Sequence, residues 1–572
     1  MTFTDYILRS ARLVDVKRRE IRRAEIRVSN GRFVSVEEAG KTVAKGIKAI
    51  DCSAVFVSPG LIDGHTHTEL SLMSMAPFAQ MLLRSGTTAA IIDPHDFVNV
   101  VGMRGLKLLQ KEAVKTPLRA FFMAPCCVPS AAGLEDSGVR LTYADVAGAL
   151  SSERVLGLAE VMDTARLLRR DRALLKMIKT AGKLNKVVDG HCPALSLQDE
   201  SRYLRISRAK TEHESVSIAE ILRKHRRGLW VHLRRSSFGR EYPYAEVFRK
   251  TKGERLMLST DGCVSPVDVM REGHISAFVR ELIAAGVRPV DAVCAATINP
   301  ALCYGLDREI GSIEAGKRAD FILMKDLNGF APYKTFINGK DVTKTKAARM
   351  TFPVYALNTV KAKSPDLDAL RIQLPRNMRA LSRVTVNVIG LRDGSLITEK
   401  KRAQMKNSNG VVNADPKRDI LKAVVLERFS NAGRPQAGFV KGFGLKSGAF
   451  GGSIGQDCQH ICVIGCDDKD IITVIDRVIR EQGGIFYAKD GRMLDGLRLP
   501  LGGIMTNRPA TEVAKRLERL EALLRRSGVK VASPYLTLSL QITLAAIPAL
   551  KLTNRGLLDA GSGAFIDVVR SR

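Results

Sequence analysis

Two histidines with a spacing suited to metal binding, His65 and His67, follow an apolar segment that runs from Ala54 to Ile62. In a β-strand, side chains at positions i and i+2 point to the same face. Both imidazoles can therefore reach one metal ion from the end of one strand. Taken alone, the spacing is more often that of two solvent-facing histidines in a turn, so the prediction of a metal site depends on further ligands elsewhere in the chain.

Such ligands stand at the ends of four later apolar segments. They are Glu160, His191, His213 and Asp261. Together with the first pair they make four imidazoles and two carboxylates, a set that suits zinc, manganese or iron. Six ligands are more than one ion with an open position needs. Because a glutamate has two oxygens, Glu160 can bridge two ions, and the sequence predicts a binuclear centre.

The elements that would position these ligands follow a β/α pattern. From about residue 55, short apolar strands alternate with amphipathic segments of helical length, which is typical of parallel β/α units. Eight strands are predicted, over residues 55–62, 88–93, 118–124, 155–160, 187–190, 209–213, 228–233 and 255–260. This number and size predict an α/β fold with a (β/α)8 TIM-type barrel over residues 59–304, whose active site lies at the carboxyl ends of the strands.

The regions on either side of the barrel have different patterns. Residues 1–58 alternate apolar and polar side chains between turns, which indicates antiparallel strands. After a long helical segment from Gly273 to Leu302, strands return near Gly311. Residues 355–572 have an α+β pattern of their own. A helix is expected there over residues 511–526, with leucines on one face: Leu517, Leu520, Leu523 and Leu524.

Composition limits the classes of partner. Lys and Arg outnumber Asp and Glu by 90 to 59, which gives a formal net charge of +31. Such a charge attracts nucleic acids and anionic lipids, but the basic residues are spread along the chain without interleaved aromatics, so a nucleic-acid role is not favoured.

Cysteine usage and apolar stretches of the sequence indicate the expected compartment. Ten cysteines without a paired framework favour a reducing compartment. The N-terminus lacks the apolar core of a signal peptide, and the longest apolar stretch, Tyr535–Leu550, is too short and polar to cross a bilayer. We expect a soluble cytoplasmic protein with no membrane partner.

The flanks of the ligands resemble those of the adenine deaminases, within the amidohydrolase superfamily. The superfamily resemblance begins with Pro59–His67, and the more specific matches are at 65–71, 84–88, 93–96, 157–162, 189–196, 212–214, 271–275, 296–300, 316–320, 441–446 and 550–557. The resemblance spans nearly the whole chain. It includes the C-terminal region, which most amidohydrolases lack.

The resemblance implies an organisation and a reaction. Residues 1–58 and 305–354 would form one composite β-sandwich, and residues 355–572 a C-terminal domain of the adenine deaminase type. Two divalent ions, Mn or Fe with Zn possible, would activate a shared water, and the resulting hydroxide would attack C6 of adenine. Asp261 would act as general base and pass the proton to the leaving ammonia, releasing hypoxanthine. A homodimer or larger homo-oligomer is implied.

Other residues are assigned around this centre by their positions. Asp93 and Asp96 follow the second strand and would hold ring nitrogens or shuttle protons, although Asp93-Pro94 also suits a turn. Glu69, near the barrel mouth, and Arg234, after the seventh strand, are expected near the substrate.

Several further histidines and cysteines are not used in this assignment: His95, His225 and His232 have no role, and neither have Cys458, His460, Cys462 and Cys466. On a flat strand, side chains two residues apart stand about 7 Å apart. That spacing is too wide for one zinc ion, so packed core cysteines are favoured over a second metal site.

Three positions depart from the family pattern and open the question of the substrate. Gly262 and Arg235 stand where the family usually has acids, and the run Gln456–His460 replaces a run richer in histidine. One alternative is an amidohydrolase of the same metal type that acts on another amino-purine or cyclic amide. Another is a catalytically weak metal-containing protein that binds an anionic partner through its positive surface.

Overall fold

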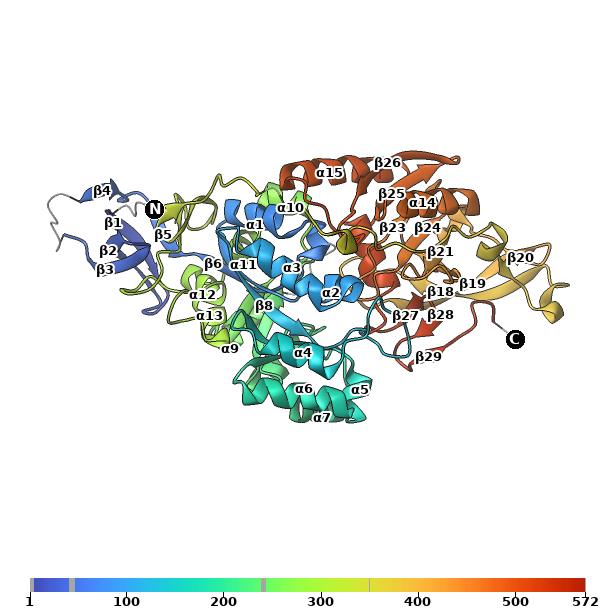
Figure 1. Ribbon diagram of the computed structural model, residues 1–572, viewed down its shortest axis with the longest axis horizontal. Coiled ribbons are helices and arrows are strands. Elements are labelled where there is room, and N and C mark those ends of the chain that lie inside the picture. The colour runs from blue at the N-terminus through green and yellow to red at the C-terminus, as the bar shows by residue number, and fades with distance from the viewer. Residues whose placement is uncertain (1–4, 41–46, 238–242, 349, 571–572) are drawn as a thin grey trace.

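The computed structural model describes residues 5–40, 47–237, 243–348 and 350–570. Figure 1 shows three parts along the longest axis of the molecule. The N-terminal strands lie at one end, an α/β barrel lies in the middle, and the C-terminal strands and helices lie at the other end.

The first part is an eight-stranded sheet assembled from two distant stretches of the chain. Its strands are β1 (Tyr6–Asp15), β2 (Glu20–Ser29), β3 (Arg32–Glu38), β4 (Lys48–Asp51), β5 (Phe56–Pro59), β14 (Phe321–Met324), β15 (Pro332–Ile337) and β16 (Lys340–Asp341). The strand order is β16-β15-β14-β5-β1-β2-β3, and β4 pairs with β1. The antiparallel pairing of β14 with β5 joins the two stretches.

The second part is the predicted parallel barrel, which the structure confirms. Its strands are β6 (Leu61–Thr66), β7 (Thr87–Ile92), β8 (Arg119–Pro125), β9 (Val155–Val161), β10 (Val187–Gly190), β11 (Thr211–Glu212), β12 (Trp230–Arg234) and β13 (Leu256–Ser259). They are ordered sequentially from β6 to β13. The last strand returns beside the first, where Asp261 N donates to His65 O at 2.9 Å.

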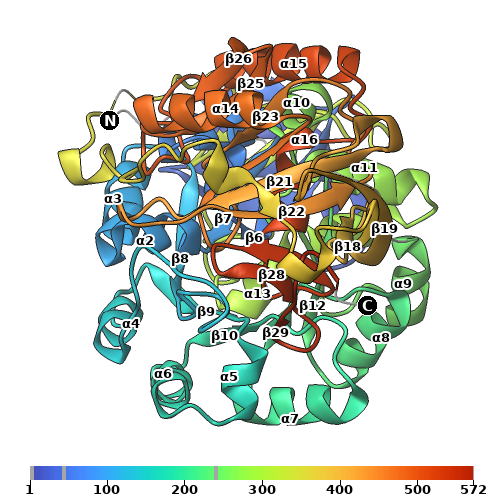
Figure 2. The same ribbon diagram turned by 90° about the vertical axis from the view of Figure 1, so that its right-hand side faces the viewer.

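Helices surround the barrel, as Figure 2 shows from the C-terminal side. They are α1 (Met75–Arg84), α2 (His95–Val101), α3 (Met103–Ala113), α4 (Tyr143–Leu150), α5 (Thr164–Leu168), α6 (Arg172–Lys183), α7 (Leu197–Ser207), α8 (Ile218–Arg226), α9 (Tyr244–Thr251), α10 (Pro266–Glu272), α11 (Ile275–Ala284), α12 (Pro289–Ala295) and α13 (Ile298–Tyr304). Within the described ranges, no helix is both long and apolar enough to cross a membrane.

Two predicted elements are divided in the structure. The expected strand 55–62 is two strands in different sheets, β5 and β6, which meet at Gly60. A Cβ at Gly60 would stand 2.2 Å from the Thr88 side chain, so this close crossing requires glycine. The expected helix 273–302 is three helices, because the chain turns at Gly286 and restarts with Pro289 as the first residue of α12.

The third part contains a ten-stranded sheet. Its strands are β17 (Ile372–Gln373), β18 (Arg383–Gly390), β19 (Glu399–Ser408), β20 (Val411–Val412), β21 (Ile420–Leu426), β22 (Gln436–Lys441), β23 (Ala449–Gly452), β24 (Ile461–Gly465), β25 (Gly484–Lys489) and β26 (Arg492–Arg498). A smaller sheet contains β27 (Leu550–Thr553), β28 (Gly556–Asp559) and β29 (Ala564–Phe565).

The helices of this part are α14 (Asp468–Arg480), α15 (Ala510–Arg526) and α16 (Pro534–Thr537). The predicted helix 511–526 is confirmed as α15. It buries Leu517, Leu520 and Leu524 on one face, and Leu523 packs at the edge of the same core. This amphipathic face holds the helix against the rest of the molecule by apolar burial.

Candidate metal centre

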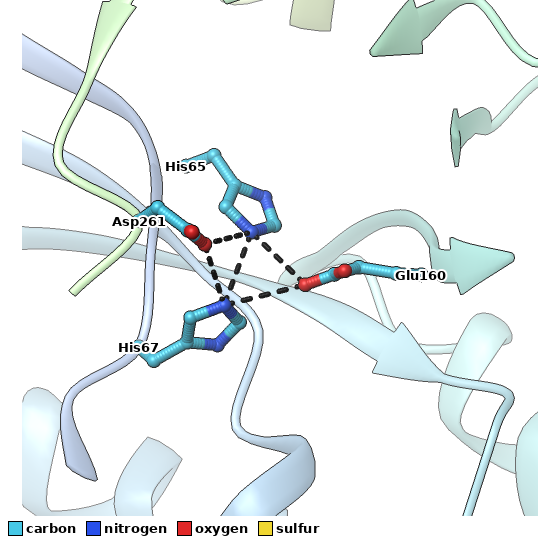
Figure 3. A group of neighbouring side chains, drawn as sticks. All are labelled: His65, His67, Glu160 and Asp261. Atoms are coloured by element: carbon cyan, nitrogen blue, oxygen red, sulfur yellow. Dashed lines mark hydrogen bonds and ion pairs between the residues drawn. The ribbon is translucent and has the colours of Figure 1, made fainter. Parts of the chain in front are cut away.

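Four buried side chains converge at the carboxyl end of the barrel: His65, His67, Glu160 and Asp261 (Figure 3). The Nε2 atoms of the two histidines are 3.3 Å apart. Oε1 of Glu160 lies 3.1 Å from the first nitrogen and 3.2 Å from the second. Oδ1 of Asp261 lies 3.4 Å and 3.0 Å from the same two atoms.

The protonation of these histidines shows that the group fits a cation. His67 Nδ1 lies 2.8 Å from the carbonyl oxygen of Asp93, which can only accept, so Nδ1 is the donor and Nε2 is the nitrogen left to bind a cation. His65 Nδ1 likewise lies 2.9 Å from Oδ2 of Asp189. Ligands about 2.1 Å from one ion stand roughly 3.0 to 3.4 Å from their neighbours in tetrahedral or octahedral geometry. The observed spacings fall in that range.

A second group meets the other oxygen of the same glutamate. Oε2 of Glu160 lies 2.7 Å from His191 Nδ1 and 3.1 Å from His213 Nε2. These three side chains form a further group of possible metal ligands, all buried. The two oxygens of Glu160 therefore face two separate sets of nitrogen ligands, which is the arrangement that a bridging carboxylate needs.

Asp189, on β10, contacts one histidine of each ligand group through its carboxylate. Its carboxylate lies 2.9 Å from His65 Nδ1 and 3.5 Å from His213 Nδ1, and Thr211 Oγ1 donates to it at 2.6 Å. Burial opposes its ionised form, but the neighbouring histidines hold the pKa of Asp189 well below its usual range. The sequence interpretation assigned it no role, although its place two residues before His191 puts both side chains on one strand face.

Asp261 is held from its outer side by an arginine. Arg234 Nη1 lies 2.6 Å from Asp261 Oδ2, and the same nitrogen pairs with Glu214. Burial penalises the charge on Asp261, yet the Arg234 guanidinium and the two histidines keep the pKa of Asp261 well below its usual range. Asp261 thus presents Oδ1 to the first group as an ionised carboxylate.

His95, which the sequence interpretation left without a role, lies beside this centre. Its ring centroid is 4.7 Å from that of His67. Its Nδ1 lies 2.9 Å from Oδ2 of Asp93, and its Nε2 lies 3.0 Å from Oδ1 of Asp457. His95 therefore links the barrel to the C-terminal domain.

A small cavity opens onto both ligand groups and has walls from two parts of the chain. Its lining from the barrel is His67, Leu70, His95, Glu160, Met162, His191, His213, Glu214 and Asp261, and its lining from the C-terminal domain is Leu396, Gln456, Asp457, Leu540 and Leu544. Three oxygens of this lining are buried without a hydrogen-bond partner: Glu214 Oε1, Gln456 Oε1 and Asp457 Oδ2. Within the described residues, the C-terminal domain thus covers the mouth of the barrel.

The expected substrate contacts Glu69, Asp93, Asp96 and Arg234 lie behind this lining. Asp96 Oδ1 accepts from Asp457 N at 3.0 Å, and Glu69 Oε1 accepts from Phe97 N at 3.0 Å. Burial and the neighbouring Asp96 raise the pKa of Glu69 to about 7. Asp93, Asp96 and Arg234 contact groups that line the cavity, whereas Glu69 accepts from Phe97, which does not line it.

Two of the family departures have structural explanations. Gly262 has φ +66, and a Cβ there would stand 2.7 Å from His67 O, so a side chain at this position would displace a ligand. Arg235 turns away from the cavity and pairs with Glu272 and, at 2.9 Å, with Glu281. Its reversed charge is therefore neutralised outside the site.

The other side chains that the sequence left without a role are not members of the ligand groups. His225 Nε2 lies 2.7 Å from Glu254 O, and His232 is buried inside the barrel near His65 and His213. Only Cys462 of the C-terminal cysteines lies in a strand, β24. No ligand group found among the described residues includes Cys458, His460, Cys462 or Cys466.

Comparison with known proteins shows what nearly the whole chain is similar to. Residues 56–342 match the amidohydrolase family, and residues 395–563 match the adenine deaminase C-terminal domain. The chain is 36% identical over 564 residues to an adenine deaminase of Archaeoglobus fulgidus, covering 99% of this chain and 95% of that protein. It is 35% identical over 572 residues to an adenine deaminase of Nitratidesulfovibrio vulgaris (strain DP4), covering 99% and 96%.

Proposed function

Since this chain belongs to the adenine deaminase family, we propose that it converts adenine and water to hypoxanthine and ammonia. The observation that carries the proposal is the meeting of two buried ligand groups on the two oxygens of Glu160. These groups lie beneath a C-terminal domain that is itself of the adenine deaminase type. The family resemblance also supports a homodimer or larger homo-oligomer.

The two groups would hold two divalent ions. His65, His67 and Asp261 would bind one ion with Oε1 of Glu160, and His191 and His213 would bind the other with Oε2. The mixture of imidazole and carboxylate ligands suits manganese or iron and also allows zinc. Such ions would supply a water molecule of lowered pKa at the site.

Asp261 would move the proton. It lies in the first group through Oδ1, while Arg234 fixes Oδ2. In the reaction, the oxygen of water adds to C6 of adenine while Asp261 takes one proton from that water. Asp261 passes this proton to the amino nitrogen as the C6–N bond breaks and ammonia leaves, and the second water proton ends on N1 of hypoxanthine. Arg234 is a positioning residue, since it keeps the carboxylate ionised and correctly turned before each turnover.

The unpartnered oxygens of Glu214, Gln456 and Asp457 would recognise the purine. Adenine offers N–H donors at its amino group and its imidazole ring. Leaving a buried acceptor unpaired destabilises the protein, and a hydrogen bond from adenine would remove that cost. His95, held between Asp93 and Asp457, also lines the cavity and would contact the amino group or the ring of adenine. Glu69 and Asp96 would act through the residues that they hold in place.

Turnover of adenine tests this proposal. Protein loaded with Mn²⁺ is expected to consume adenine and release ammonia in a one-to-one ratio, measured by loss of adenine absorbance and by an ammonia assay. Other amino-purines and cyclic amides under the same conditions are the comparison. Turnover of one of these but not of adenine would replace the proposed substrate, and no turnover of any at full metal occupancy would favour the metal-containing binding protein.

A further inference from the structure

A second, larger cavity lies away from the metal centre, where three segments of the chain meet. Its volume is about 1100 Å³. Helix α3 forms one wall, residues 347–348, 350–353 and 355 form the second, and residues 507–509 before α15 form the third. Ligand-binding cavities for small molecules typically have volumes of about 300 to 1,000 Å³, so this cavity has room for a ligand larger than a purine base.

The wall formed by α3 is strongly basic. Arg104, Lys107 and Lys111 are spaced by three and four residues, so they lie on one helix face, and Lys115 stands two residues after the end of the helix. None of the three lysines forms an ion pair within the described residues. No carboxylate is among the residues that line the cavity. Uncompensated like charges around a concave surface concentrate an anion there.

The other walls differ in character. Arg508 faces the cavity but is paired with Glu512, so the unpaired charge comes from α3 and Lys115. Phe352 and Tyr355 line the second wall, and the Arg104 guanidinium carbon lies 4.4 Å from the centroid of the Tyr355 ring. The cavity therefore joins a cationic wall to an aromatic one.

We propose that this cavity binds a nucleoside polyphosphate. The α3 cations would neutralise the phosphates, and Phe352 and Tyr355 would stack against the base. The concave shape favours a small ligand over a nucleic-acid strand, which would need an open basic surface. This binding site is independent of the metal centre and would use part of the net charge of +31 that the reaction does not require.

Binding is tested by isothermal titration calorimetry on the full-length protein with three probes: ATP, inorganic triphosphate and adenosine. We expect ATP to bind most tightly and triphosphate more weakly. Adenosine is expected to bind at least about tenfold more weakly than ATP at this site, because the charged wall contributes most of the attraction. Raising the salt concentration should weaken ATP binding. ATP should also raise Tm, because the ligand contacts only the folded chain.

The double variant K107E/K111E locates the site. It is expected to weaken ATP binding at least about tenfold and to abolish the ATP-dependent rise in Tm, while adenine turnover without ATP is unchanged. The matched control is K179E/K183E on α6, which has the same four-residue spacing and the same change in net charge, and whose two lysines are also exposed. This control should bind ATP as the wild type does.

Three results would overturn the proposal. The first is the absence of ATP binding to the wild type, and the second is an equal loss of ATP binding in both double variants. The third is tight binding of a single-stranded RNA oligonucleotide that ATP does not displace and K107E/K111E removes. That last result would assign the basic wall to nucleic acid instead.

Discussion

Replacing Glu160 with alanine is expected to lower kcat/KM for adenine by more than about 10³-fold and to remove metal from both ligand groups. Metal ions in such sites contribute several kcal/mol of transition-state stabilisation, and each 1.36 kcal/mol is tenfold in rate. Because Oε1 and Oε2 of Glu160 face different nitrogen ligands, one substitution removes a ligand from each group. Steady-state kinetics and elemental analysis of the same preparation measure both effects.

The variant E160Q separates loss of chemistry from loss of folding. Glutamine keeps the volume of the side chain and one carbonyl oxygen but removes the negative charge. We expect E160Q to retain the wild-type circular dichroism spectrum and still lose most of its metal and activity. If E160A retained two ions per chain and activity within tenfold of the wild type, Glu160 would not be the bridging residue.

The second large effect is expected on kcat, when Asp261 is replaced with asparagine. Proton transfer by a positioned side chain contributes about 10² to 10⁴ in rate, so kcat for adenine should fall by that factor. The metal bound by His191 and His213 should remain, because Asp261 Oδ1 lies only in the first group. Ammonia released at fixed times under saturating adenine gives kcat, and elemental analysis gives the amount of metal that is retained.

The matched control for this variant is D307N, since Asp307 does not line the cavity or contribute to the ligand groups. It should keep wild-type kcat and metal content. A D261N enzyme whose kcat is within threefold of the wild type would assign the proton transfer to another group. The side chains of Glu214 and His95, which share the cavity lining, would then be examined first.

The positions of the candidate ligands could be predicted from the sequence because they depend on local pattern and on one general rule. Each of His65, Glu160, His191 and Asp261 lies at or just after an apolar strand, and a parallel barrel gathers the carboxyl ends of its strands at one face. The structure brings these side chains together as expected. Their exact element boundaries moved by only a few residues, as at β7 and β12.

The contribution of the C-terminal domain could not be predicted in the same way. Asp457 contacts His95 across 362 positions of sequence, and no strand or helix period carries information about such a contact. The contact with the C-terminal domain also gives His95 its second partner, Asp457, and explains why Asp96 faces the loop at Asp457 rather than the cavity. The sequence alone showed a departure from the family at Gln456–His460, not that this run forms a wall of the site.

The roles of Asp189 and Arg235 depend on neighbours in space. Asp189 lies two strand positions before a ligand, but its pairing with His65 requires the curvature that brings β10 opposite β6. Arg235 carries a charge whose effect depends on Glu272 and Glu281, which neutralise it outside the cavity. The charge reversal at Arg235 opened the question of substrate preference on the condition that the side chain faces the cavity, and the structure instead places it in an ion-pair network with Glu272 and Glu281.

Anomalous diffraction from crystals of the Mn²⁺-loaded protein tests the bridged centre most directly. Data collected at the manganese absorption edge should show two peaks in each chain, one beside Oε1 of Glu160 with His65 and His67, the other beside Oε2 with His191 and His213. A single peak at full loading, or two peaks that are not both within coordination distance of the Glu160 carboxylate, would contradict the binuclear arrangement.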